Sequence, residues 1–119
     1  MDKNLVLKFV TMPMAIKIFN DDKESFKVSK TSSVYLDLLD SILKQLEKDF
    51  KQLKADMFTK HHLDVKRLGK SNRMVRYRVN KDVIEFSPGE LRNKTKELME
   101  EYIATVEVEK QERVWKINN

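Results

Sequence analysis

The sequence predicts one small α+β domain in which an antiparallel sheet packs on one long and one medium helix. Two observations predict the helices: a single apolar stripe over residues 33–58 and a helix-start signal at Ser87. A third, the alternation of apolar and polar residues within 63–86, predicts strands. A chain of 119 residues can bury one core but hardly two, so residues 1–119 are expected to form a single domain.

The N-terminal segment, residues 1–30, is expected to form a β-meander. Leu5, Leu7 and Phe9 alternate along the chain, as the residues on one face of a strand do. Pro13 should bend or end this strand, and the polar residues 20–23 favour a turn after a second apolar run. The predicted strands cover residues 4–10, 14–19 and 25–28.

Residues 33–58 are expected to form a long helix, preceded by good N-cap residues at 31–33. Its apolar residues recur at steps of three and four, whereas its lysines lie off this stripe. The helix is longer than a domain of this size needs, so part of it is a candidate for pairing with a second copy of the chain. The stripe consists of Tyr35, Leu39, Ile42, Leu46, Phe50, Leu53 and Met57.

Three short strands are expected within residues 63–86. Leu63 and Val65 mark the first, residues 69–72 form a hairpin loop, and the second strand covers 73–79. A turn then leads to the third strand, residues 83–86. On the second strand, one face would carry Val75, Tyr77 and Val79, and the other Met74, Arg76 and Arg78.

The second helix is expected at residues 88–104. Ser87 can act as its N-cap, Pro88 suits the first helical position, and Glu90 can complete a capping box. Residues 105–119 fit either an extension of this helix or a pair of strands. Trp115 in this tail is interpreted as a cover for the edge of the core, or alternatively as an interface anchor. The buried stripe of the helix would comprise Leu91, Thr95, Leu98 and Tyr102.

Positive charge is concentrated in the strand region. Residues 59–88 hold eight basic and three acidic residues, an excess that equals the net charge of +5 of the whole chain. A basic β-ribbon of this kind can lie along a phosphate backbone, with Arg suited to phosphate oxygens. The alternative is a solvated sheet face neutralised by acids such as Glu85. The candidate nucleic-acid-binding residues are Lys66, Arg67, Lys70, Arg73, Arg76, Arg78 and Lys81.

Composition and motifs bear on several classes of protein and of functional site. The chain has no cysteine and no apolar run of membrane-spanning length, so a cytoplasmic protein without membrane contact is expected. His61 and His62 would point to opposite faces of a strand, so no metal site and no cofactor is expected. Asp64-Val65-Lys66 resembles the acid-x-Lys element of restriction-type nucleases, with Glu85 as a possible second carboxylate.

The leading hypothesis is therefore a small non-enzymatic regulatory or accessory protein that binds DNA or RNA through its basic hairpin. The alternative is a protein-interaction module, dimeric through residues 35–57, which docks an acidic partner. A metal-dependent nuclease at Asp64, Lys66 and Glu85 is a third and weaker alternative.

Overall fold

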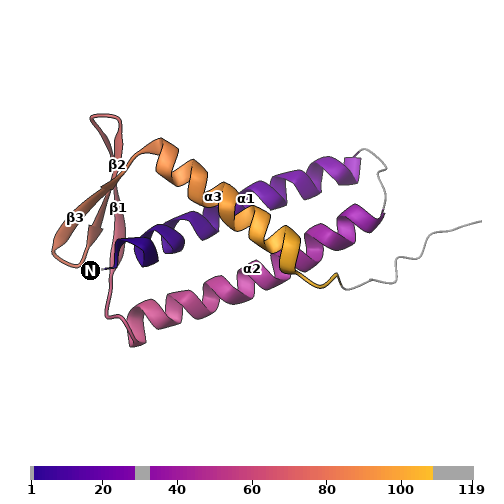
Figure 1. Ribbon diagram of the computed structural model, residues 1–119, viewed down its shortest axis with the longest axis horizontal. Coiled ribbons are helices and arrows are strands. Elements are labelled where there is room, and N and C mark those ends of the chain that lie inside the picture. The colour runs from indigo at the N-terminus through magenta and orange to yellow at the C-terminus, as the bar shows by residue number, and fades with distance from the viewer. Residues whose placement is uncertain (1, 29–32, 109–119) are drawn as a thin grey trace, which may run out of the picture.

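The computed structural model describes residues 2–28 and 33–108 (Figure 1). Within them three helices and a three-stranded antiparallel sheet confirm the predicted α+β class. The sheet lies across one end of the helices, with strand order β1-β2-β3. The elements are α1 (Lys3–Val28), α2 (Ser33–Thr59), β1 (Val65–Ser71), β2 (Met74–Val79), β3 (Asp82–Phe86) and α3 (Pro88–Thr105).

The predicted N-terminal β-meander is wrong, because residues 3–28 form one helix, α1. The expected turn at residues 20–23 and the expected strand at 25–28 also have helical backbone. Pro13 lies inside this helix, where its missing N–H leaves one carbonyl without its usual donor, and its side chain is exposed.

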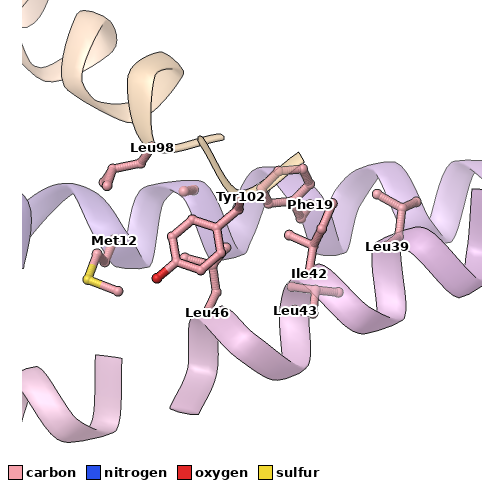
Figure 2. Close-up of a cluster of buried hydrophobic side chains, with 9 residues drawn as sticks. Met12, Phe19, Leu39, Ile42, Leu43, Leu46, Leu98 and Tyr102 are labelled. Atoms are coloured by element: carbon pink, nitrogen blue, oxygen red, sulfur yellow. The ribbon is translucent and has the colours of Figure 1, made fainter. Parts of the chain in front are cut away.

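The reason for the error is the central position of α1. This helix contacts the sheet, α2 and α3, so apolar residues occur on several of its sides rather than on one stripe. Val6 and Val10 pack against the sheet, whereas Met12 and Phe19 pack between the helices (Figure 2). A helix that is apolar on several sides can imitate the alternation of a strand over short stretches.

The predicted long helix is confirmed as α2, and most of its stripe is buried. Leu39, Ile42 and Leu46 pack against α1 and α3 in the larger of two apolar clusters (Figure 2). Phe50 and Leu53 are half-buried, and Tyr35 is exposed, with 52% of its surface accessible. The central part of the stripe is thus buried within the chain.

The three strands predicted within residues 63–86 are confirmed, but the hairpin loop is shorter than expected. Asn72 and Arg73 alone make the β1–β2 turn, and both have positive φ, at 51° and 62°. This is the conformation that two-residue hairpins prefer. Residues 69–71, predicted to be loop, belong to β1. As predicted, Val75, Tyr77 and Val79 share a buried face, which packs against α1 and Leu91.

The capping box at the start of α3 is present as predicted. The amide of Glu90 donates to Ser87 Oγ at 3.0 Å, and Glu90 Oε1 accepts from the Ser87 amide at 3.2 Å. The predicted stripe of Leu91, Thr95, Leu98 and Tyr102 is buried.

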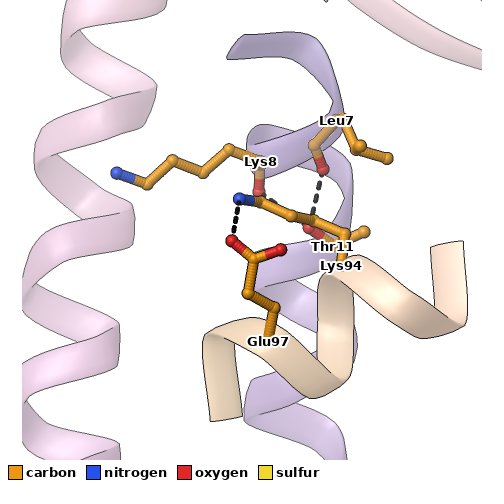
Figure 3. A network of polar contacts seen from close by, with 5 residues as sticks. All are labelled: Leu7, Lys8, Thr11, Lys94 and Glu97. Atoms are coloured by element: carbon orange, nitrogen blue, oxygen red, sulfur yellow. Dashed lines mark hydrogen bonds and ion pairs between the residues drawn. The ribbon is translucent and has the colours of Figure 1, made fainter. Parts of the chain in front are cut away.

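Two buried threonines lie where α1 and α3 pack together. Thr11 of α1 donates to the carbonyl of Leu7 at 2.6 Å. Figure 3 shows this contact beside Lys94 and Glu97 of α3. Thr95 of α3 likewise donates to the carbonyl of Leu91, at 2.7 Å. Both hydroxyls are satisfied within their own helices, so these buried positions carry no orphan polar group.

The described chain ends shortly after α3. Helix α3 stops at Thr105, and Val106–Val108 are not helical. The predictions for residues 109–119, including the two for Trp115, lie outside the described residues. No helix in the described ranges has the length and apolar character needed to cross a membrane.

Candidate functional site

A β-bulge in β1 brings two of the predicted basic residues to the same face. The register shifts between Arg67 and Gly69, so that Arg67 pairs with Tyr77 and Lys70 pairs with Val75. In a regular strand, residues three apart point to opposite faces. The extra residue at the bulge places both basic side chains on the face of the sheet that carries Tyr77 and Val75.

Arg67 and Lys70 lie at the rim of a groove formed by α1, α3 and the sheet. The groove has a volume of about 550 Å³ and mostly apolar walls. Met14 and Ile18 of α1 line one side, and Met99 and Ile103 of α3 line the other. We call it the basic groove; its walls also include Val75, Pro88, Leu91 and Thr95.

Two further basic residues complete the rim of the basic groove. Arg92 and Lys96 lie one turn apart on α3, and both are exposed. Lys96 is 3.9 Å from Glu100, the one acidic residue that lines the groove. Arg67, Lys70 and Arg92 form no ion pair with any residue in the described part of the chain. Four basic residues against one acidic residue therefore give the groove a positive rim above an apolar floor.

The opposite face of the sheet carries a different part of the predicted set. Lys66 pairs with Arg78 across the strands, and Arg76, two residues before Arg78 on β2, lies on the same face, as predicted. This outer face is partly neutralised. Arg76 Nε lies 3.5 Å from Glu85 Oε1, and Arg78 lies 3.9 Å from Asp64. The side chains of Arg76, Glu85 and Arg78 are 40 to 49% exposed and that of Asp64 is 79% exposed, so water screens the pairs and each contributes little to stability.

The remaining two predicted residues lie in the turns at opposite ends of β2. Arg73 is in the β1–β2 turn and Lys81 is in the β2–β3 turn. The seven predicted residues therefore do not form one continuous patch. They divide between the basic groove, the outer face and the two turns.

The residues of the nuclease alternative do not form a cluster of metal ligands in the described part of the chain. No group of three or more His, Cys, Asp or Glu side chains in these ranges is suited to holding a metal ion. Asp64 precedes β1 and Glu85 lies on β3, so β2 separates them, and each lies near an arginine. His62 has a positive φ of 52° in the connection from α2 to β1.

Sequence reasoning missed the contribution of α3 to the site. Arg92, Lys96 and Met99 were not predicted as binding residues, because α3 has nearly balanced charge and only packing places it beside β1. For the shared face of Arg67 and Lys70 on β1, one sequence signal was available: a glycine inside a strand pattern, here Gly69, is typical of a bulge. Its φ of 116° is in the region that favours glycine.

Comparison with known proteins places the chain in a family without identifying an individual relative. Comparisons with curated proteins and with solved structures found no match. A family described as YhjD protein matches residues 1–107, which includes all three helices and the sheet. The chain therefore belongs to the YhjD protein family.

Proposed function

We propose that this protein is a non-enzymatic interaction module that docks an acidic protein partner in the basic groove. The observation that carries the proposal is the combination of an apolar floor with four basic residues at the rim. Protein interfaces typically bury an apolar centre in which Arg is enriched, within a polar rim. Opposite charge on a partner would speed encounter and fix its orientation.

A second copy of this chain is a poor candidate for the partner. The chain has a net charge of +5, and the groove rim is itself basic, so two copies would repel each other at this surface. The central stripe of α2 is buried against α1 and α3.

The proposal can be tested by selecting peptides from a random display library on the immobilised full chain. We expect the selected peptides to combine Asp or Glu with apolar residues. They should lose at least tenfold in affinity for an Arg67→Glu/Arg92→Glu variant, a factor that corresponds to about 1.4 kcal/mol. The matched control is Lys66→Glu/Arg78→Glu, which reverses two charges on the outer face. Peptides without acidic residues, or equal losses in both variants, would contradict the proposal.

Nucleic-acid binding remains a second candidate function, favoured by the arrangement of Lys66, Arg76 and Arg78 on one face of the β1–β2 ribbon. Binding that depends on several phosphate contacts should weaken steeply as salt concentration rises. Fluorescence anisotropy with labelled duplex DNA and RNA at two salt concentrations tests this. A Lys66→Ala/Arg76→Ala/Arg78→Ala variant should lose the binding. An absence of binding at low salt would eliminate this candidate.

A further inference from the structure

We propose that the segment bound in the basic groove is an amphipathic helix of the partner whose acidic residues cluster at one end of its apolar face. This inference rests on the proposed function above, and it specifies the conformation and charge pattern of the bound segment.

The shape of the groove suits a helix. Met14 and Ile18 lie four residues apart on α1, and Met99 and Ile103 lie four residues apart on α3. Side chains four residues apart lie on the same side of a helix, so these residues form two roughly matching apolar rows along the groove. Ile18 and Ile103 are 39% and 50% exposed, which leaves apolar surface available for a partner. A helix with apolar residues at steps of three and four can contact both rows.

The edge of the sheet disfavours an added strand as the bound form. Strand β1 is an edge strand that pairs only with β2 among the described residues. It carries exposed Lys66, Arg67 and Lys70, together with the bulge beside Gly69. Exposed charges and bulges on edge strands are features that prevent pairing with another strand. The alternative in which an extended segment continues the sheet is therefore less compatible with this surface than a helix.

Charge is distributed unevenly along the groove. Arg67 and Lys70 lie on β1, at the sheet end, and Arg92 is in the second turn of α3 near the sheet. Glu100 and Ile103 lie two to three turns further along α3. The sheet end is thus basic, whereas the far end is apolar with one acidic residue. A helix that matches this distribution would place its acidic residues over the sheet end and neutral or apolar residues over the far end.

A second hollow extends the apolar surface beyond Met14. It has a volume of about 410 Å³ and is lined by Phe9, Phe50 and Val65 among others. Met14 and Arg67 line both this hollow and the basic groove. Met14 and Arg67 therefore adjoin apolar surface in both hollows.

The test uses synthetic peptides of about 15 residues, the length at which isolated helices become marginally stable. The first has an apolar helical stripe with three glutamates at one end. The second replaces the glutamates by glutamine, and the third has a central proline that prevents a continuous helix. We expect the first to bind with a gain in helical circular dichroism, and the other two to bind at least tenfold more weakly. Affinities would be measured by isothermal titration calorimetry with the full chain.

Two matched protein variants locate the site. Ile103→Asp should weaken binding of the first peptide at least tenfold, whereas Val83→Asp on the outer face should not. The two wild-type residues are similarly exposed, at 50% and 46%, so each variant adds one charge at a surface position, and thermal melts would check that both are folded. Equal losses in both variants would contradict the assignment to the groove.

The outcomes separate this inference from the proposed function. Suppose that the proline peptide binds as tightly as the first and that Arg67→Glu/Arg92→Glu abolishes binding of both. The helical conformation of the bound segment is then wrong, whereas the proposal of an acidic partner is still supported. If no acidic peptide binds in the groove, including those recovered by selection, both proposals fail. If the glutamine peptide binds equally well, the charge pattern is wrong.

Discussion

The hydroxyl of Tyr102 donates a hydrogen bond of 2.5 Å to Oδ2 of Asp49, and this contact joins the end of α3 to the middle of α2. Tyr102 is only 9% exposed and belongs to the apolar cluster between the helices. We expect Tyr102→Phe to lower the free energy of unfolding by about 1 to 2 kcal/mol, because a hydrogen bond to a charged group is lost. Urea unfolding would measure the change. A double-mutant cycle with Asp49→Ala should show coupling between the two residues; strictly additive effects would contradict a direct contribution of this bond.

The same tyrosine should make stability depend on alkaline pH. Burial, and then the hydrogen bond and the negative charge of Asp49, raise the pKa of Tyr102 well above its ordinary value of 10.0. The hydroxyl therefore stays protonated in the folded chain, whereas it ionises near pH 10 in the unfolded chain. The contribution of Tyr102 is complete below that pH and declines as pH rises above it.

This decline can be isolated by comparing the wild type with Tyr102→Phe. The difference between their free energies of unfolding should be constant from about pH 8 to about pH 9 and shrink as the pH rises to about 11, because only the wild type has this titrating group. A difference that is constant over this range would show that the hydroxyl is not held in its protonated form.

The bulge that aligns the groove residues depends on Gly69. Its φ of 116° is unfavourable for residues with a Cβ, although an added Cβ would have no atom within 4 Å. Gly69→Ala should therefore cost about 1 to 2 kcal/mol through backbone strain alone. Gly89→Ala is the matched control. It lies in the first turn of α3, where an added Cβ meets only Ser87 Oγ at 3.8 Å. This change should be neutral or stabilising. Equal effects in thermal melts would argue against strain at the bulge.

Asn80, in the β2–β3 turn, forms hydrogen bonds with the segment that precedes β1. Its Oδ1 accepts from the Asp64 amide at 2.9 Å, its Nδ2 donates to the His62 carbonyl at 3.0 Å, and its φ is 55°. Asn80→Gly keeps the backbone conformation available but removes both bonds, so it should cost about 1 to 3 kcal/mol. Asn80→Ala adds the penalty of a positive φ and should cost about 1 kcal/mol more. If the two substitutions were equivalent in urea unfolding, the backbone part of this explanation would be wrong.

Local patterns were sufficient to predict two of the helices and the three strands. The stripe of α2 faces one direction, and the capping box at Ser87 is a contact between neighbours in sequence, so both are visible in the order of residues. Helix α1 could not be recognised in this way. Its apolar residues contact several elements that are distant in sequence. They therefore form no single stripe, and their spacing indicates a helix only once the positions of those elements are known.

The positive charge of the strand region was likewise evident from the sequence, but its arrangement was not. The sequence by itself determined that residues 59–88 carry the excess charge, that the chain has an α+β class, and which face of β2 is buried. The structure decided that Arg67 and Lys70 share a face, for which Gly69 was the one local signal, and tertiary packing alone decided that Arg92 and Lys96 join them. The physical reason is that a bulge changes the alternation of a strand by one residue, and helix packing brings together residues that no local pattern relates.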